Sequence, residues 1–475
     1  TEPNSIYWPN TAERNASNVA AQMFEGPTWI DNDGRVQPLL AESWEVSEDG
    51  MVYTFTLREG VTFHDGDAMD AEDWVASWKA GSEESNAYAY QYQRVESVEA
   101  VDDMTVRMEL PKPSALFPLE LATWAIIPSG YYEEVGVKGL EREPVGTGPF
   151  RFVSWDRGDR IVLEAFDDYW QEGFPKVKRV VFRPIPESST RLAAVQTGEV
   201  DIAQRFSAEE AATLEQATDV EVLTYPVDRV YYIAFNNMTT GKGTPLEDVR
   251  VRQALNYAVD KEAIIDSILD GAAIPATGLI SGSSVGQDPS IQPYPYDPER
   301  ARELLAEAGH PDGFEVGMAC PTGAYTNFEE VCQAVAGYLE DVGVTLEGGE
   351  IQFMESGQYW DLEAKKQLPP LFGDSWSSTL PESLERLRGA MLADRADFSA
   401  WEDPWVIDMI GRIGRTMDQE ERIQLYQELH RHMYEDPPFI YLYEPFAFEG
   451  VNVRVHDYAP RGAEDYFLKG VWVDA

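Results

Sequence analysis

The succession of strand-like and helix-like patterns along the 475 residues is the feature that most constrains the fold. Tyr53, Phe55 and Leu57 alternate with threonines, and this period of two predicts a half-buried strand. The C-terminal half alternates between helix-like and strand-like segments, at 298–309, 314–319, 328–342, 418–433 and 439–443. Strands that alternate with helices predict an α/β chain, here with mixed strand order. The length predicts about two or three domains.

The middle of the chain is expected to hold a strand at 230–235 and a long helix after it. That helix would start at Glu247 and run for about twenty residues, because apolar residues recur at helical spacing. Gly271 would end it, as a glycine after the last turn commonly does. An extended loop rich in Gly, Ser and Pro is expected at 281–298.

The chain is strongly acidic, with 84 Asp and Glu against 37 Lys and Arg and a net charge of −47. Such a surface repels phosphate backbones and anionic lipids, which excludes nucleic acid or a polybasic membrane anchor as the main partner. The hydrophobic fraction of 43% is that of a folded protein, so the charge coats a globular core. The 27 Arg outnumber the 10 Lys, which is typical either of a salt-adapted, marine surface or of a high-GC composition bias.

The chain contains no apolar run of about 18 to 20 residues, the length needed to cross a bilayer. It begins at Thr1 without an initiator Met. That start is expected of an exported protein whose signal peptide has been removed, and equally of a trimmed chain.

The only cysteines, Cys320 and Cys332, are close enough in sequence to form one local bridge. In an oxidising compartment a disulfide that closes so short a loop would stabilise the fold by about 3 kcal/mol. Two buried free thiols are the alternative interpretation. Metal binding by this pair alone is not expected, because the spacing is not that of a zinc site and no third ligand is near in sequence.

No convincing catalytic or metal-binding constellation is present. Gly282–Gly286 matches the nucleophile-elbow pattern of serine hydrolases, but a Pro-rich loop follows it instead of a helix, so we expect a chance match. His430 and His432 are two residues apart on a predicted helix, which points their rings to different sides. Acidic turns at 31–34 and 65–67 are similar to calcium loops but lack the later Glu. We therefore expect a binding protein without cofactor or metal.

Aromatic residues in polar loops are more informative about function than these motifs. The chain has 13 Trp and 23 Tyr, more than a core of this size requires. The segment 373–379 places Trp376 among small hydroxyl side chains beside a glycine, and 25–29 is similar. A core tryptophan is the simpler interpretation, and a cleft that stacks a ligand on an aromatic ring is the functional one.

Several motifs occur in an order that identifies a family. They are Gln37–Trp44, Ser47–Gly50, Tyr53–Gly66, Gly146–Phe150, Tyr169–Trp170, Thr197–Asp201, Phe235–Asn237 and Asp248–Leu255. Through these motifs, spread over nearly the whole chain, it closely resembles the family 5 extracytoplasmic solute-binding proteins. These are the oligopeptide, dipeptide and nickel-type receptors of ABC importers.

The resemblance implies a periplasmic-binding-protein-like type II fold of cluster C. Two α/β lobes would be joined by a hinge, with an extra domain inserted in the first lobe. The implied boundaries are 1–37, 145–250 and 446–475 for lobe I, 38–144 for the extra domain and 251–445 for lobe II. The motifs identify the fold, whereas the ligand contacts lie elsewhere.

The resemblance also implies where a ligand would bind. In peptide-binding members, a segment like 24–28 pairs with the ligand backbone, an Asp at the position of Thr379 holds the amino terminus, and an Arg at the position of Gly323 holds the carboxylate. Both charged partners are absent here, although Asp374 could take the amine role, so a neutral ligand fits better than a zwitterionic peptide. The ligand-binding residues expected are Glu25, Gly26, Thr28, Asn236, Tyr325, Trp376, Ser377, Ser378, Thr379 and Tyr443.

The resulting hypothesis is an extracytoplasmic substrate-binding protein that captures a small peptide or peptide-like ligand between two lobes and delivers it to an ABC permease. An oligosaccharide is the alternative ligand, and a nickel chelate or an opine is a further one. A secreted serine hydrolase is a distant alternative. We expect a monomer in the periplasm or outside the cell, associated with the membrane through the transporter or through a lipid anchor.

Overall fold

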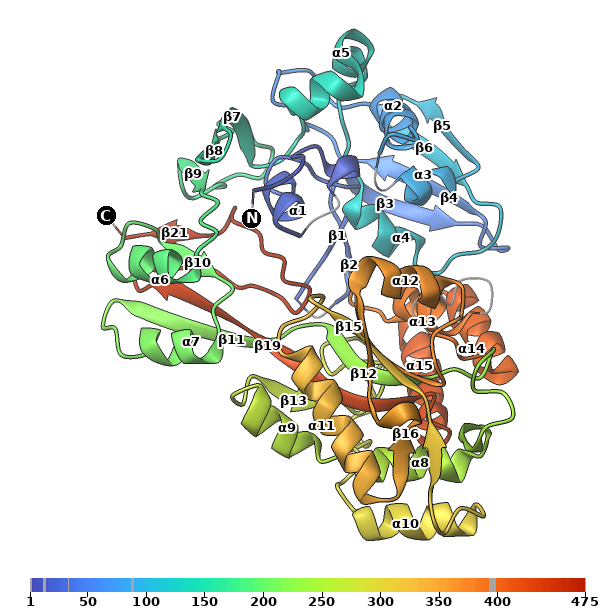
Figure 1. Ribbon diagram of the computed structural model, residues 1–475. Helices are drawn as coiled ribbons and strands as arrows, with labels where there is room; N and C mark the ends of the chain where they lie inside the picture. The colour runs from blue at the N-terminus through green and yellow to red at the C-terminus, as the bar shows by residue number, and fades with distance from the viewer. Residues whose placement is uncertain are drawn as a thin grey trace. The chain divides into compact units, whose positions relative to one another are not determined.

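The computed structural model describes residues 2–11, 14–32, 34–86, 89–378, 380–392 and 399–474. The chain forms two compact units, each of which combines strands with helices (Figure 1). Unit 1 consists of residues 1–206, 210–223 and 449–475, and unit 2 consists of residues 207–209 and 224–448. This architecture agrees with the predicted α/β class.

Unit 1 contains a four-stranded antiparallel sheet with the strand order β3-β4-β6-β5. Its strand β4 (Val52–Leu57) is the one predicted from the alternating residues, and Tyr53, Phe55 and Leu57 are buried. The strands of unit 1 are β1 Thr28–Ile30, β2 Val36–Pro38, β3 Ala41–Val46, β5 Ser97–Asp102, β6 Thr105–Glu109, β7 Phe150–Asp156, β8 Arg160–Ala165, β9 Arg179–Phe182, β10 Ile202–Gln204, β20 Val455–His456 and β21 Trp472–Val473. Its helices are α1 Arg14–Ala20, α2 Ala71–Gly81, α3 Ala89–Gln93, α4 Phe117–Glu120, α5 Ser129–Arg142 and α6 Ser188–Gln196. Helix α7 (Ala208–Leu214), strand β11 (Val220–Pro226) and strand β19 (Phe439–Asn452) contain residues of both units.

The core of unit 1 has two hydrophobic clusters. One lies between the four-stranded sheet and α2, and it includes the fully buried Phe55 and Trp74. The other includes Phe24, Phe150 and Leu163 and draws on the three-stranded sheet β7-β8-β9. Most residues of the first cluster fall within 38–144, the segment that we predicted to be an extra domain.

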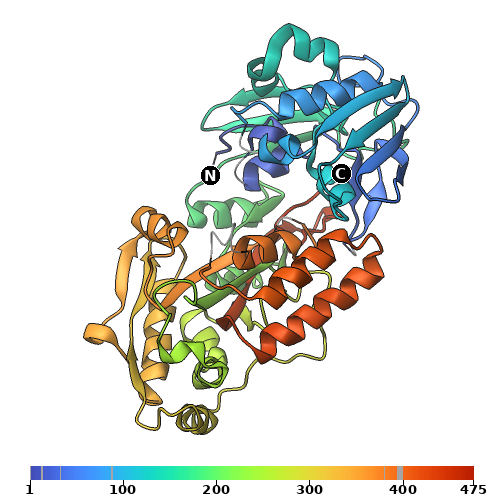
Figure 2. The same cartoon turned by 90° about the vertical axis from the view of Figure 1, so that its right-hand side faces the viewer.

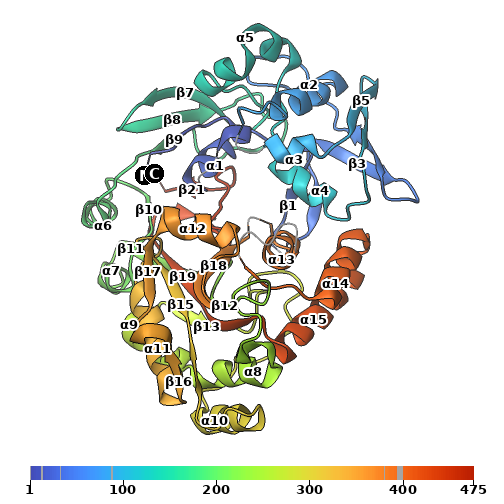
Figure 3. The same cartoon turned by 45° about the vertical axis from the view of Figure 1, so that its right-hand side comes forward.

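Unit 2 is built on five successive strands of the largest sheet, in the order β19-β12-β18-β15-β17 (Figure 3). Strand β12 (Arg229–Phe235) is antiparallel to β18 (Leu371–Ser377) and to β19 (Phe439–Asn452), whereas β15 (Met318–Thr322) is parallel to β18 and to β17 (Gln352–Glu355). The strand order is therefore mixed, as predicted. The remaining strands are β13 Ala273–Pro275, β14 Phe314–Val316 and β16 Val344–Leu346.

Helices surround this sheet, and α14 and α15 run side by side (Figure 2). The helices of unit 2 are α8 Val249–Ala258, α9 Lys261–Ile268, α10 Pro298–Glu307, α11 Phe328–Asp341, α12 Ser356–Ala364, α13 Leu384–Met391, α14 Pro404–Arg415 and α15 Gln419–Glu435. The bounds of α10, α11 and α15 lie within two residues of the predicted ones. No helix in the described part of the chain is both long and apolar enough to cross a membrane.

The single helix predicted from Glu247 is instead two helices, α8 and α9. Val259 has an extended backbone, and the side chain of Asp260 accepts a hydrogen bond from the amide of Ala263 to cap α9. The capping signal at Asp260 therefore overrides a continuous apolar pattern. Gly271 follows with a φ of +73°, which favours a glycine after the last turn.

The boundary between the units also differs from the lobe boundary that we predicted. We expected residues up to 250 in lobe I, whereas 224–250 belong to unit 2. The reason is that β12 pairs with β18 along its full length, which fixes this segment in the sheet of unit 2. The segment 38–144 is not separated from the rest of unit 1. An extra domain there stays a prediction.

Candidate functional site

Glu25, a predicted ligand residue in unit 1, is bound within the protein. Its buried carboxylate accepts hydrogen bonds from Tyr169 Oη at 2.6 Å, Trp170 Nε1 at 2.9 Å and Thr147 Oγ1 at 3.2 Å. Burial raises the pKa of Glu25, although these donors and the charge of Lys469 act in the opposite direction. The carboxylate therefore joins distant parts of unit 1, and its contact with a ligand stays a prediction.

Gly26 and Thr28 also have roles inside unit 1. A Cβ atom on Gly26 would lie 2.3 Å from the carbonyl oxygen of Leu121, so only glycine fits this close approach. The buried hydroxyl of Thr28 donates to the carbonyl oxygen of Pro118 at 2.5 Å. Both contacts hold the N-terminal segment against 118–121.

Asn236 closes a turn at the end of β12 in unit 2. Its amide nitrogen donates to Leu368 O at 3.1 Å, and its side-chain oxygen accepts from the Thr239 amide at 2.9 Å and from the Thr239 hydroxyl at 3.0 Å. The residue is 1% exposed. Asn236 therefore supports the turn, and its contact with a ligand stays a prediction.

Three predicted residues of unit 2, Tyr325, Ser377 and Tyr443, come together around Arg229 and Tyr231. The ring of Tyr231 stacks on Tyr443, with centroids 4.6 Å apart and planes 14° apart. It also meets Tyr325 edge to face, at 5.3 Å and 84°. The register between β12 and β19 places Tyr231 beside Tyr443. These contacts pack three tyrosine rings from segments that are far apart in the sequence, and Tyr443 among them is 3% exposed.

Arg229 lies at the start of β12 and is half-buried. Its Nη1 donates to Ser375 Oγ at 2.7 Å and its Nη2 donates to Ser377 Oγ at 3.2 Å. Its Cζ lies 5.9 Å from the ring centroid of Tyr325, within the range of a cation–π contact. We define the Arg229 cluster as Arg229, Tyr231, Tyr325, Ser375, Ser377 and Tyr443.

Asp374 supports this cluster from within the sheet. Its carboxylate is fully buried and accepts a hydrogen bond from Tyr325 Oη at 2.6 Å. Burial raises the pKa of Asp374 to about 6, although hydrogen bonds from Tyr325 and Glu363 and the charge of Arg229 lower it. Asp374 therefore orients Tyr325, and the amine-binding role suggested for it would require access that the structure does not give.

The other predicted residues of this loop contact the protein. Trp376 is half-buried and lies over Gly389 of α13, where an added Cβ would be 2.2 Å from the indole ring. Ser378 is buried and donates to Leu380 O at 2.8 Å. Thr379 lies outside the described residues. The predictions that these residues contact a ligand are not tested.

Ser284, the serine of the nucleophile-elbow match, is buried in a polar cluster. Ser284 Oγ donates to Asp228 Oδ1 at 3.1 Å, and Asp228 also forms a buried ion pair with Arg386. Among the described residues, the hydrogen bonds of the Ser284 hydroxyl involve Asp228 and Ser281 and no imidazole. The general base that a serine hydrolase needs is therefore not beside this serine in the described part of the chain.

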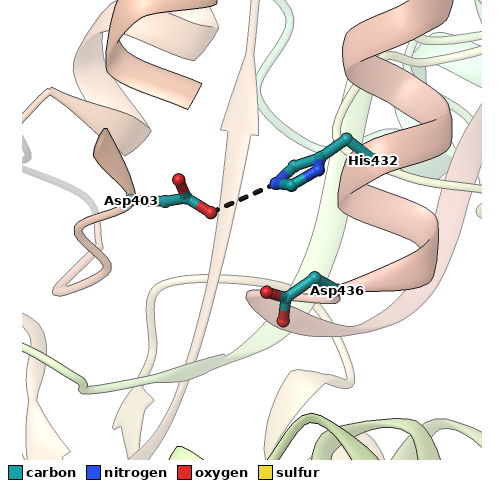
Figure 4. A group of neighbouring side chains, drawn as sticks. All are labelled: Asp403, His432 and Asp436. Carbon is teal, nitrogen blue, oxygen red and sulfur yellow. Dashed lines mark hydrogen bonds and ion pairs between the residues drawn. The ribbon is translucent and has the colours of Figure 1, made fainter. Parts of the chain in front are cut away.

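Figure 4 shows a group in unit 2 with potential metal ligands. One side-chain atom of each of Asp403, His432 and Asp436 lies within 4.8 Å of the others. His432 Nε2 is 3.2 Å from Asp403 Oδ2, and Asp436 forms an ion pair with Arg252. The His432–Asp403 contact and the Asp436–Arg252 ion pair account for the positions of these side chains.

Cys320 and Cys332 are joined in a disulfide between β15 and α11. Both sulfur atoms lie against Gly373, where an added Cβ would be 2.8 Å and 3.1 Å from them. The closed loop contains Tyr325. The disulfide is therefore adjacent to the segment that carries Asp374.

Comparisons with known proteins identify the family. The model of the bacterial extracellular solute-binding proteins, family 5 (middle), matches residues 35–392. The glutathione-binding protein GsiB of Salmonella paratyphi A is 33% identical over 435 residues, which cover 89% of this chain and 83% of GsiB.

Solved structures agree with this match. HbpA2 from Haemophilus parasuis has a TM-score of 0.91 and 25% identity, with 100% of this chain and 98% of HbpA2 covered. The periplasmic binding protein DppA from Helicobacter pylori, in complex with the peptide STSA, has a TM-score of 0.76 and 24% identity, with 100% and 96% covered, and shows the fold. The predicted type II periplasmic-binding-protein fold is therefore confirmed, and the relatives are binding proteins and not enzymes. The chain belongs to the family 5 extracellular solute-binding proteins, the substrate-binding components of ABC importers.

Proposed function

We propose that this protein captures a small peptide or peptide-like solute and delivers it to the permease of an ABC importer. The observation that carries the proposal is the Arg229 cluster, which combines tyrosine rings, serine hydroxyls and a guanidinium on one sheet. Rings and hydroxyls suit the apolar and amide parts of a peptide, and a guanidinium suits a carboxylate. The similarity to a glutathione-binding protein supports a peptide-type ligand.

An oligosaccharide remains the alternative ligand, because Gly323 and Thr379 replace the charged residues that hold peptide termini in the receptors this chain resembles. The presence of Arg229 in the cluster weighs against a wholly neutral ligand. A partly desolvated guanidinium is better stabilised by a carboxylate than by sugar hydroxyls. We therefore rank the peptide-type ligand first.

The remaining parts of the proposal follow from the family. Ligand would stabilise a closed arrangement of the two lobes through contacts that only that arrangement makes. The protein would act as a monomer in the periplasm or outside the cell, either free or held at the membrane by the transporter or by a lipid anchor. The acidic surface, with its charge of −47, would suit a saline medium.

A thermal-shift screen tests the proposal. The purified protein is melted with reduced glutathione, with di- to pentapeptides and with neutral oligosaccharides, at low and at high salt. A ligand at about 100 times its Kd should stabilise the folded state by about 2.7 kcal/mol. We expect stabilisation by one or more peptide-type compounds, with a 1:1 stoichiometry by calorimetry. Stabilisation by oligosaccharides alone would overturn the proposal.

A further inference from the structure

Arg229 differs from the buried arginines of unit 2 in its partners. Arg252, Arg386 and Arg422 each form an ion pair with a carboxylate of the protein, namely Asp436, Asp228 and Glu382. Within the described ranges, Arg229 forms hydrogen bonds with two neutral hydroxyls and no ion pair with a carboxylate.

The side chain of Arg229 is nevertheless fixed in position. Ser375 and Ser377 are the residues opposite Tyr231 and Arg229 in the β12–β18 register, so both hydroxyls lie beside the guanidinium. The two hydrogen bonds use one N–H of each Nη atom and leave further donors of the planar group. Held in this way, the guanidinium loses little conformational freedom when a ligand binds.

The surroundings favour an anion at this position. Asp374, which supports the cluster from within the sheet, is fully buried and already accepts a hydrogen bond from Tyr325. The hydroxyl of the half-buried Ser377 can also donate, since a hydroxyl does both, whereas Ser375 is buried and positions the guanidinium. A carboxylate beside Arg229 would therefore meet a fixed cation and the Ser377 hydroxyl, next to Tyr325.

We infer that Arg229 is the carboxylate anchor of this protein, and that its ligands carry a free carboxylate bound by the Arg229 guanidinium beside Ser375, Ser377 and Tyr325. This inference rests on the proposed function and makes it more specific. The guanidinium comes from β12, whereas Gly323 provides no side chain. A charge that the sequence lacks at one position is thus supplied from another strand of the same sheet.

The test combines protein variants with blocked ligands. Reduced glutathione and trialanine are each compared with forms whose carboxylates are esterified or amidated, and Kd is measured by calorimetry. Wild-type protein should bind the free acids more tightly than the blocked forms by about 10- to 100-fold, the range for a hydrogen bond to a charged group. Arg229→Gln should remove this preference, with a change below about 3-fold for the blocked forms.

Further variants separate anchoring from folding. Arg229→Lys keeps the positive charge but not the planar set of N–H donors, and should give an intermediate loss of affinity for the free acids. The double variant Ser375→Ala with Ser377→Ala should weaken acid binding less than Arg229→Gln, because the cation remains. Arg160→Gln removes an exposed arginine of unit 1 and should change neither affinity. A general folding defect in Arg229→Gln would weaken acids and blocked forms equally, and that result would overturn the inference.

The remaining outcomes distinguish the two proposals. Equal affinity of wild-type protein for acids and blocked peptides would refute the anchor while the peptide function stands. Binding of an acidic sugar, lost in Arg229→Gln, with no binding of any peptide would refute the function while the anchor stands. Binding of neutral oligosaccharides alone would refute both.

Discussion

The hydrogen bond between Tyr325 and Asp374 gives a prediction that can be worked out from the structure. Tyr325→Phe removes one oxygen atom and leaves a fully buried carboxylate without the donor at 2.6 Å. A hydrogen bond to a charged group contributes about 1.5–3 kcal/mol, whereas one between neutral groups contributes about 0.5–1.5 kcal/mol. The loss of stability should therefore depend on whether Asp374 is ionised.

The direction of the pH dependence follows from the pKa. The folded state holds the pKa of Asp374 at about 6, above its ordinary value of 3.8, because burial disfavours the charged form. This group thus lowers stability above pH 6, and the penalty disappears as the pH falls from 6 to 3.8. The Tyr325 hydroxyl favours the charged form, so its removal should raise the pKa further. We expect Tyr325→Phe to cost about 2 kcal/mol at pH 8 and about 1 kcal/mol at pH 5.

Urea denaturation at pH 8 and pH 5, followed by tryptophan fluorescence, measures both values. Carbon-13 NMR of the aspartate carboxyl groups measures the pKa of Asp374 directly, with Asp374→Asn to assign the signal. Tyr296→Phe is the control, because Tyr296 is exposed and meets Tyr338 edge to face. An equal loss at both pH values, together with an unchanged pKa, would refute the reasoning.

Three further predictions concern other parts of the molecule. Replacing Cys320 and Cys332 by serine should cost about 2–4 kcal/mol in urea denaturation, and a reductant should then have no further effect on the variant, unlike on the wild type. Gly26→Ala should destabilise unit 1 by about 2 kcal/mol or more through the backbone clash, whereas Gly130→Ala, with open space around it, should be neutral; equal melting temperatures would contradict this. Trp376→Ala should abolish the ligand-induced rise in melting temperature, and an unchanged rise would place the ligand elsewhere.

The sequence predicted those parts of the fold that depend on local patterns. The alternation of Tyr53, Phe55 and Leu57 predicted β4, and helical spacing predicted α10, α11 and α15, because a residue's neighbours in sequence determine which face is buried. The break between α8 and α9 was missed, although aspartate, the residue type at position 260, commonly caps the start of a helix. The boundary near 224 could not be predicted, because it depends on which strand β12 pairs with.

In the candidate site, too, some residues were predicted from the sequence and one was missed. Tyr325, Ser377 and Tyr443 were expected from the family resemblance, and the structure brings them together. Arg229 was missed because its partners, Ser375 and Ser377, lie 146 and 148 residues away in sequence and are brought to it by the register between β12 and β18. An arginine that alternates with a tyrosine at the start of an otherwise apolar strand is the signal that could have found it.

The buried ion pair between Asp228 and Arg386 has a consequence for how this receptor could change its ligand. Asp228 is the sequence neighbour of Arg229, yet its charge is compensated by Arg386 and by the hydroxyls of Ser281 and Ser284. The charge that stabilises the fold and the charge offered to a solute are thereby kept on separate residues. A substitution at residue 229 can therefore change the ligand specificity of this binding protein while the charge of Asp228 stays compensated.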